Sequence, residues 1–160
     1  MQPSIAERFA YGTPLGDDFE VHTVPRSYTA LAGRFLLAAI FIVSGFAKLS
    51  DPAGTVGYMN SAGVPNADIL VYVAGTAELL GGLALALGFL ARVAAVGLFV
   101  LMILINVYMH AFWALEGAAR TMDMVQFIKN LAIMGGLLLV VAHGPGRASI
   151  DARLRRPLQA

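Results

Sequence analysis

The sequence predicts an all-α integral membrane protein, a bundle of four transmembrane helices with its N- and C-termini in the cytoplasm. Three observations lead to this prediction: the composition, four apolar segments and the placement of the basic residues. Of the 160 residues, 58% are hydrophobic and only 13% are charged, about half the charged fraction usual in soluble domains. A chain this short has too little interior to hide that much apolar surface from water.

Four apolar segments have the length of membrane-spanning helices, since about 20 residues cross roughly 30 Å of hydrocarbon. They cover residues 30–49, 69–90, 93–115 and 124–143. The link between the second and third segments is short, so these two helices are expected to form an antiparallel hairpin. Gly144-Pro145-Gly146 stops the fourth helix. The transmembrane domain is therefore expected over residues 30–146.

The segments between and beyond the spans are expected to be irregular. Residues 50–68 contain prolines and glycines that prevent a continuous helix, and residues 116–123 form a polar loop. Residues 1–29 are expected to be a polar cytoplasmic extension with a short amphipathic turn near residues 5–11. Residues 147–160 form a basic cytoplasmic tail.

The placement of Lys and Arg predicts the orientation, because cytoplasmic loops carry the excess of these residues. Only Lys48 and Arg120 fall on the opposite side, and Lys129 lies within a span. The cytoplasmic side receives eight arginines: Arg8, Arg26, Arg34, Arg92, Arg147, Arg153, Arg155 and Arg156.

Polar residues within the spans define a candidate binding site. A charge at the centre of a membrane helix costs about 3 kcal/mol, so such residues are usually functional or paired. From a rise of 1.5 Å per residue, all of them fall in the outer half of the bilayer, some near its midplane. No such residue is expected in the cytoplasmic half between the interface arginines. The set contains Ser44, Lys48, Glu78, Asn106, His110, Trp113, Gln126, Lys129 and Asn130.

This layering predicts a pocket that opens outward. Asn106, His110 and Trp113 are spaced by four and three residues and should share one helical face. Glu78 would form the floor of the pocket, and Lys48, His110, Trp113 and Lys129 its rim.

Simpler structural roles are also open for these residues. Lys129 would extend its stem to the outer headgroups, while Lys48 and Trp113 would be interfacial anchors. Glu78 is too short and too deep to reach water. Its structural role would be a pair with Lys129 or a hydrogen bond to Asn106.

The types of residue present limit which cofactors this chain could bind. The absence of cysteine excludes disulfides and iron–sulfur ligation. Bis-histidine haem is not expected, because His110 and His143 fall in opposite leaflets. Glu78 and His110 alone make a weak metal site, so no metal is expected. No basic cluster is long enough to suggest nucleic acid. A quinone fits better, stacked near Trp113, with its carbonyl oxygens bound by His110, Lys129 or Asn130.

A series of short motifs runs along the chain from residue 33 to residue 151. The motifs are Gly33-Arg34, Ser44-Gly45, Lys48-Leu49, Asp51-Pro52, Gly54-Thr55, Gly57-Tyr58-Met59, Glu78-Leu79-Leu80-Gly81-Gly82, His110-Ala111-Phe112-Trp113, Phe127-Ile128-Lys129-Asn130, His143-Gly144-Pro145-Gly146, Ser149 and Asp151. Over roughly residues 30–153 they resemble the DoxX family. The resemblance implies a four-helix protein of bacterial inner membranes. Relatives are associated with redox work, such as a thiosulfate:quinone oxidoreductase subunit and a mycobacterial complex with superoxide dismutase and a sulfurtransferase.

These observations favour a subunit or accessory factor of a quinone-linked membrane redox system, at most a quinone-binding subunit of an oxidoreductase complex. Glu78 would carry a proton, while His110 and Lys129 would polarise the ligand. Electrons must come from a redox protein partner, for which residues 1–28 are a candidate docking segment. Two alternatives stay open: a small proton-coupled transporter with Glu78 as the carrier group, and a structural subunit of a larger membrane complex.

Overall fold

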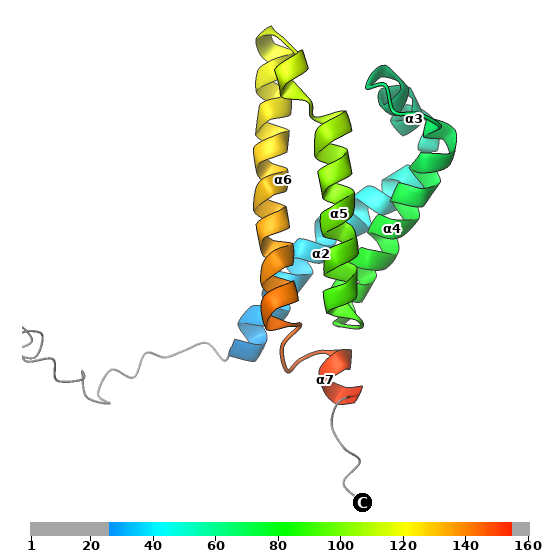
Figure 1. Cartoon of the computed structure of the whole chain (residues 1–160). Coiled ribbons are helices and arrows are strands. Elements are labelled where there is room, and N and C mark those ends of the chain that lie inside the picture. Colours follow the sequence, from blue (N-terminus) through cyan, green and yellow to red (C-terminus); the bar gives the residue numbers. More distant parts are fainter. Residues whose placement is uncertain (1–25, 155–160) are drawn as a thin grey trace, which may run out of the picture.

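The computed structural model describes residues 26–154, and this part of the chain is helical without any strand. Figure 1 shows how the elements are arranged. They are α2 (Arg26–Ser50), α3 (Pro52–Ser61), α4 (Ala67–Leu87), α5 (Ala91–Met109), the short 3-10 helix η1 (Phe112–Ala114), α6 (Gly117–His143) and α7 (Ile150–Leu154).

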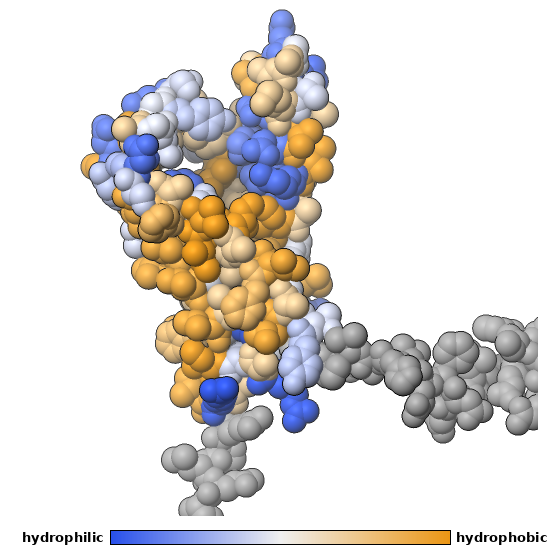
Figure 2. Space-filling model, turned by 180° about the vertical axis from the view of Figure 1, so that it is seen from behind, coloured by the Kyte–Doolittle hydropathy of each residue, from blue (hydrophilic) through white to orange (hydrophobic). Residues whose placement is uncertain are grey.

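Four segments are long and apolar enough to cross a membrane, which confirms the predicted fold class. They are Tyr28–Ser50, Ala67–Leu87, Ala91–Ala114 and Gly117–His143. Large apolar side chains cover their outward surface; Leu36, for example, is 79% exposed. Figure 2 shows these side chains as an apolar band between more polar ends. Such a band is unfavourable in water and matches the interior of a bilayer.

The bundle has two distinct ends (Figure 1). The end that we name the α7 end contains the start of α2, the turn between α4 and α5, the end of α6 and α7. The opposite end, named the α3 end, contains α3, η1 and the start of α6.

Helices α2 and α4 pack most closely, because glycine lets their backbones approach. A Cβ atom at Gly45 of α2 would lie 2.5 Å from the Leu79 backbone nitrogen and 2.6 Å from the Gly75 carbonyl oxygen of α4. Helix α5 then packs between α4 and α6, whereas α2 and α6 meet at few positions. Small residues at helix contacts are the usual way in which membrane helices associate. The bundle is therefore closed between α2 and α4 and more open between α2 and α6.

Each of the four segments expected to be irregular contains some helix, since even the N-terminal extension includes the start of α2 at Arg26. Pro52 lies at the start of α3, where its fixed φ angle and missing N–H are tolerated. The prediction of a loop is therefore wrong for residues 52–61, although the chain does break between α2 and α4 as expected. The tail predicted from residue 147 also contains α7, and α6 already begins at Gly117, so that most of the expected loop at 116–123 is helical. The predicted turn at residues 5–11 lies outside the described residues.

Arg34 is buried at the α7 end. It is only 2% exposed, and its guanidinium donates to the carbonyl oxygens of Leu85 at 3.3 Å and Ala148 at 2.6 Å. Arg34 was expected among the arginines at the cytoplasmic interface, and its burial inside the protein corrects that placement. The burial is possible because two backbone carbonyls, one from the last turn of α4 and one from the returning tail, bind the charged group.

Asp151 of α7 caps a helix far away in sequence. Its carboxylate accepts hydrogen bonds from the backbone N–H groups of Leu90 at 2.8 Å and Ala91 at 3.1 Å, at the start of α5. The backbone N–H of Asp151 donates to the Gly88 carbonyl oxygen at 2.9 Å. These first N–H groups have no partner within α5, so the tail completes the turn between α4 and α5.

Replacement of Asp151 by Ala should destabilise the fold, because the loss of a helix cap costs about 1 kcal/mol. We expect Asp151→Ala to lower the melting temperature in detergent, followed by the fluorescence of Trp113, the single tryptophan. Arg153→Ala, at an exposed position of the same short helix, is the control and should leave it unchanged. Equal melting temperatures for the two variants would contradict the capping role.

Candidate functional site

A polar cavity of about 250 Å³ lies among the four spans, toward the α3 end. It contains six of the nine polar residues selected from the sequence, so residues placed at similar depths by the helical rise do meet here. Lys48, Asn106 and Trp113 do not line it. The lining residues are Ile40, Phe41, Ser44, Glu78, Met102, Ile105, His110, Gln126, Lys129, Asn130 and Ile133.

Glu78 forms an ion pair with Lys48 at one wall of the cavity. The Lys48 ammonium donates to Glu78 Oε2 at 2.8 Å and to Ser44 Oγ at 2.6 Å. The Glu78 side chain is 3% exposed and that of Lys48 is 19% exposed. The expected partners of Glu78, Lys129 or Asn106, are therefore wrong, and Lys48 is not simply an interfacial residue. The reason is the close packing of α2 on α4: a Cβ at Gly75, one turn before Glu78, would lie 3.1 Å from the Lys48 Cβ.

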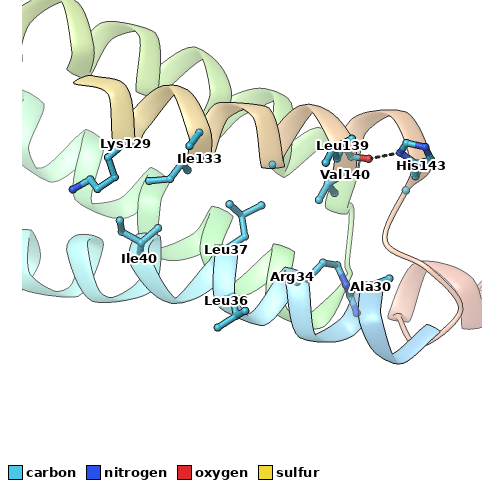
Figure 3. Close-up of a pocket in the computed structure, with 14 residues that line it drawn as sticks. Ala30, Arg34, Leu36, Leu37, Ile40, Lys129, Ile133, Leu139, Val140 and His143 are labelled. Carbon is cyan, nitrogen blue, oxygen red and sulfur yellow. Dashed lines mark hydrogen bonds between the residues drawn. The ribbon is translucent and has the colours of Figure 1, made fainter. Parts of the chain in front are cut away.

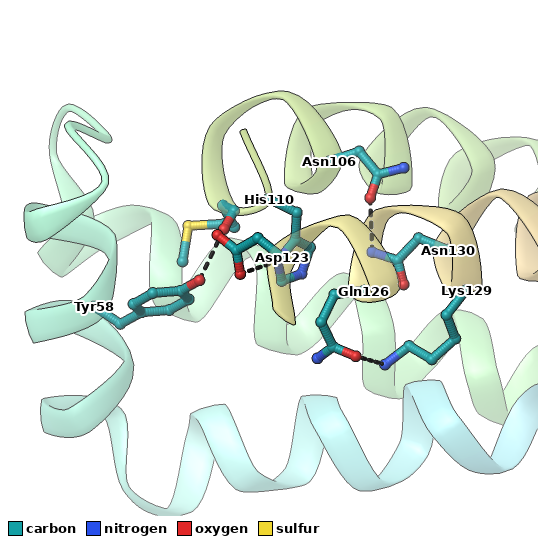
Figure 4. A network of polar contacts seen from close by, with 8 residues as sticks. Tyr58, Asn106, His110, Asp123, Gln126, Lys129 and Asn130 are labelled. Atoms are coloured by element: carbon teal, nitrogen blue, oxygen red, sulfur yellow. Dashed lines mark hydrogen bonds and ion pairs between the residues drawn. The ribbon is translucent and has the colours of Figure 1, made fainter. Parts of the chain in front are cut away.

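A second polar pair joins α5 to α6. The Asn130 side-chain amide donates to Asn106 Oδ1 at 2.8 Å, and both residues are buried (Figure 4). Asn106 thus lies behind the cavity and positions Asn130, which lines it. A buried amide pair of this kind is stable only when both partners are satisfied.

Lys129 differs from the other members because it is exposed. Its ammonium donates to Gln126 Oε1 at 2.9 Å (Figure 4), and within residues 26–154 it has no ion-pair partner. Both side chains line the cavity. This leaves donor capacity at the edge of the cavity that faces α2.

The predicted helical face of Asn106, His110 and Trp113 is interrupted, because α5 ends at Met109. His110 has a non-helical backbone with φ −128° and ψ 43°, while the Tyr58 hydroxyl of α3 donates to the Met109 carbonyl oxygen at 2.8 Å. That carbonyl belongs to the last turn, where no partner exists within the helix. The side chain of His110 still reaches the cavity.

Trp113 lies apart from the cavity, in an aromatic cluster. Its ring centroid is 5.3 Å from that of Phe112 and 5.9 Å from that of Phe127, in edge-to-face contacts. It is 57% exposed. The predicted stacking of Trp113 on a ligand in the cavity is therefore wrong, and its position fits an aromatic anchor at a membrane surface.

Asp123 and Tyr58 belong to the polar network, although sequence reasoning did not select them. Asp123 Oδ1 is 3.5 Å from His110 Nδ1 (Figure 4). Burial, and secondly the negative charge of Asp123, raise the pKa of Tyr58. Asp123 was expected in the loop before the fourth span, so it was not considered for the site. Its spacing from Gln126 and Lys129, about one and two helical turns, would have indicated that all three lie on the same face of α6.

An apolar groove of about 800 Å³ runs between α2 and α6 (Figure 3). It begins at the cavity, with which it shares Ile40, Lys129 and Ile133, and extends to Arg34 and His143 at the α7 end. Small residues keep it open; a Cβ at Gly33 would meet no atom within 4 Å. The remaining lining residues are glycines and aliphatic side chains: Ala30, Leu36, Leu37, Ala132, Gly136, Leu139, Val140 and Gly144.

Comparison with known proteins agrees with this architecture. The chain is 36% identical over 129 residues to inner membrane protein YphA of Escherichia coli (strain K12), covering 80% of this chain and 91% of YphA. It is 37% identical over 126 residues to inner membrane protein YqjF of the same organism, covering 79% of this chain and 92% of YqjF. The membrane protein Rv3486 of Mycobacterium tuberculosis is 30% identical over 137 residues, covering 77% of this chain and 79% of Rv3486. No solved structure matches the chain.

The DoxX family profile matches residues 29–111, which include most of α2 and all of α3, α4 and α5. With the four apolar spans and the two E. coli relatives, this places the chain in the inner membrane as a multi-pass protein. The chain belongs to the DoxX family.

Proposed function

We propose that this chain binds the head group of a lipid-soluble quinone in the polar cavity and acts as a quinone-binding subunit of a membrane redox system. The observation that supports it best is the continuity of a polar cavity with an apolar groove between α2 and α6. A molecule with a polar ring and a long apolar tail needs both environments. The cavity would take the ring and the groove would take the tail.

The donors around the cavity suit carbonyl oxygens. Lys129, Gln126 and His110 line it together with Asn130, and a carbonyl oxygen accepts hydrogen bonds from all four side-chain types. The cavity volume of about 250 Å³ is just below the usual range for ligand pockets, which suits a single ring without its tail.

The role of Glu78 differs from the one inferred from sequence. Its carboxylate is engaged with Lys48 at 2.8 Å, so a proton taken up by it would leave the ammonium of Lys48 without its counter-ion. We therefore assign Glu78 to holding Lys48 and the cavity wall. Proton exchange with the ligand is assigned to His110.

The electron donor is proposed to be a separate redox protein. The candidate docking segment at residues 1–28 lies mostly outside the described residues and stays a prediction. The α7 end is proposed to face the cytoplasm. The orientation is inferred from the excess of Lys and Arg on the cytoplasmic side. Arg34 is buried and Lys48 is paired, so both are left out of the count. The cytoplasmic side then has seven basic residues and the opposite side one, instead of eight and two.

A structural subunit is the second candidate, favoured by the two buried pairs. Lys48–Glu78 joins α2 to α4 and Asn106–Asn130 joins α5 to α6. Both contacts would serve helix packing even with an empty cavity. This candidate predicts no ligand.

Lys129→Met should weaken quinone binding without unfolding the protein. Lys129 is exposed, and within the described residues its ammonium donates a hydrogen bond only to Gln126. Loss of a charged donor, at about 1.5–3 kcal/mol, corresponds to a decrease in affinity of roughly 10- to 100-fold. The measurement is the rise in melting temperature with added decylubiquinone. Arg120→Met, at an exposed basic position of the same helix, is the control. Absence of a shift in the unmodified protein would refute the proposal and favour the structural candidate.

Gly33→Leu should exclude the quinone tail from the groove and leave the binding of the quinone ring in the cavity unchanged. The new side chain enters open space in the groove, and exclusion of two methylenes, at about 0.8 kcal/mol each, gives roughly a tenfold loss of affinity. The loss should be seen with decylubiquinone and not with ubiquinone-0, which has no tail.

Gly135→Leu is the matched control for this substitution, since a Cβ there also meets no atom within 4 Å and Gly135 does not line the groove. Equal binding of decylubiquinone to both variants would show that the tail lies elsewhere.

A further inference from the structure

His110 and Asp123 lie between two hollows of the molecule. His110 lines the polar cavity among the spans. Asp123 lines a cleft of about 480 Å³ at the α3 end, between α3 and the segment from Tyr108 to Asp123; we name it the α3 cleft. Figure 2 shows the molecule hollowed between two lobes at this end. The 3.5 Å contact between His110 Nδ1 and Asp123 Oδ1 is therefore a contact between the two walls.

The imidazole has one obvious partner. Its Nδ1 is buried and makes no hydrogen bond within the described residues; Asp123 Oδ1 faces it at ion-pair distance, 3.5 Å. The exposed fraction of the side chain is 14% for His110 and 21% for Asp123, so the carboxylate lies closer to water. A carboxylate on one ring nitrogen fixes the tautomer and leaves the other nitrogen, Nε2, for a ligand.

We propose that Asp123 is a positioning residue that holds His110 toward the cavity and completes a proton path from the α3 cleft to the cavity. The doubly protonated ring gives its Nε2 proton to the oxygen of the quinone that is being reduced and keeps its Nδ1 proton against Asp123. Water in the cleft then restores the lost proton through the Asp123 carboxylate. The two electrons come from the redox partner of the proposed function, on which this inference rests, because the bound quinone is the acceptor of the proton.

The other charged groups around His110 are already engaged or lie across the cavity. Glu78 of α4 is paired with Lys48 of α2, and Lys129 of α6 is bound to Gln126. Tyr58 of α3 donates to the Met109 carbonyl oxygen. Within the described residues Asp123 is therefore the carboxylate that faces His110.

The direct test is the tautomer of His110 in the purified full-length protein, read from the ring-nitrogen signals of labelled histidine by NMR without any quinone. The chain has three histidines, and the His110 signals are the ones missing in His110→Gln. A carboxylate that faces Nδ1 holds the proton of the neutral ring on that nitrogen, so Asp123→Asn should move the proton to Nε2. Asp123→Glu should restore the original tautomer in part. Asp68→Asn, at an exposed position of α4, is the control and should leave the tautomer unchanged.

Decylubiquinone binding separates this inference from the proposed function. If quinone binds, Asp123→Asn should weaken its binding by roughly 2- to 10-fold, because one hydrogen bond from a misdirected ring is lost, at about 0.5–1.5 kcal/mol. An unchanged His110 tautomer in Asp123→Asn would overturn the inference even if quinone binds. A changed tautomer without quinone binding would support the His110–Asp123 contact and refute the proposed function.

Discussion

Lys48 and Glu78 meet where α2 and α4 approach each other most closely, and the rest of the bundle depends on this contact. In a bilayer no water compensates a buried charge, so each must find its partner within the protein. Gly45 and Gly75 let the backbones come near enough for the ammonium of Lys48 to reach the carboxylate of Glu78 at 2.8 Å. The ion pair and the glycine contact require one another: without the close approach the charges would be separated, and without the pair a charge would remain in the apolar interior.

The same requirement explains why the bundle is closed on one side and open on the other. Asn106 and Asn130 satisfy each other between α5 and α6, and α5 packs on α4. No comparable polar contact joins α2 to α6 in the part of the chain that the structure describes, and a groove remains there. Lys129 stands at this opening with an exposed ammonium. The helix pairs are thus joined by polar contacts, while the boundary between α2 and α6 keeps a groove that reaches the cavity.

The four spans could be predicted from the sequence, because hydropathy determines them. The depth of the cavity along the helices could also be predicted, because it follows from the helical rise per residue. The sequence was not sufficient for the partner of Glu78, since the choice of Lys48 depends on how α2 is rotated against α4. The end of α5 at Met109 depends on a hydrogen bond from Tyr58, a residue of another helix. The burial of Arg34 depends on a carbonyl 114 positions away in the chain. Each of these misses concerns a long-range contact, which local periodicity does not contain.

A double-mutant cycle on Lys48→Met and Glu78→Gln, measured as the free energy of unfolding in detergent, tests the central claim most directly. Each single substitution leaves one polar or charged group without its partner, and breaking a buried pair costs about 3–5 kcal/mol. The account predicts that the double variant is more stable than the sum of the single effects allows, with a coupling energy above about 1 kcal/mol. Additive effects of the two substitutions would contradict it, because the two side chains would then contribute independently.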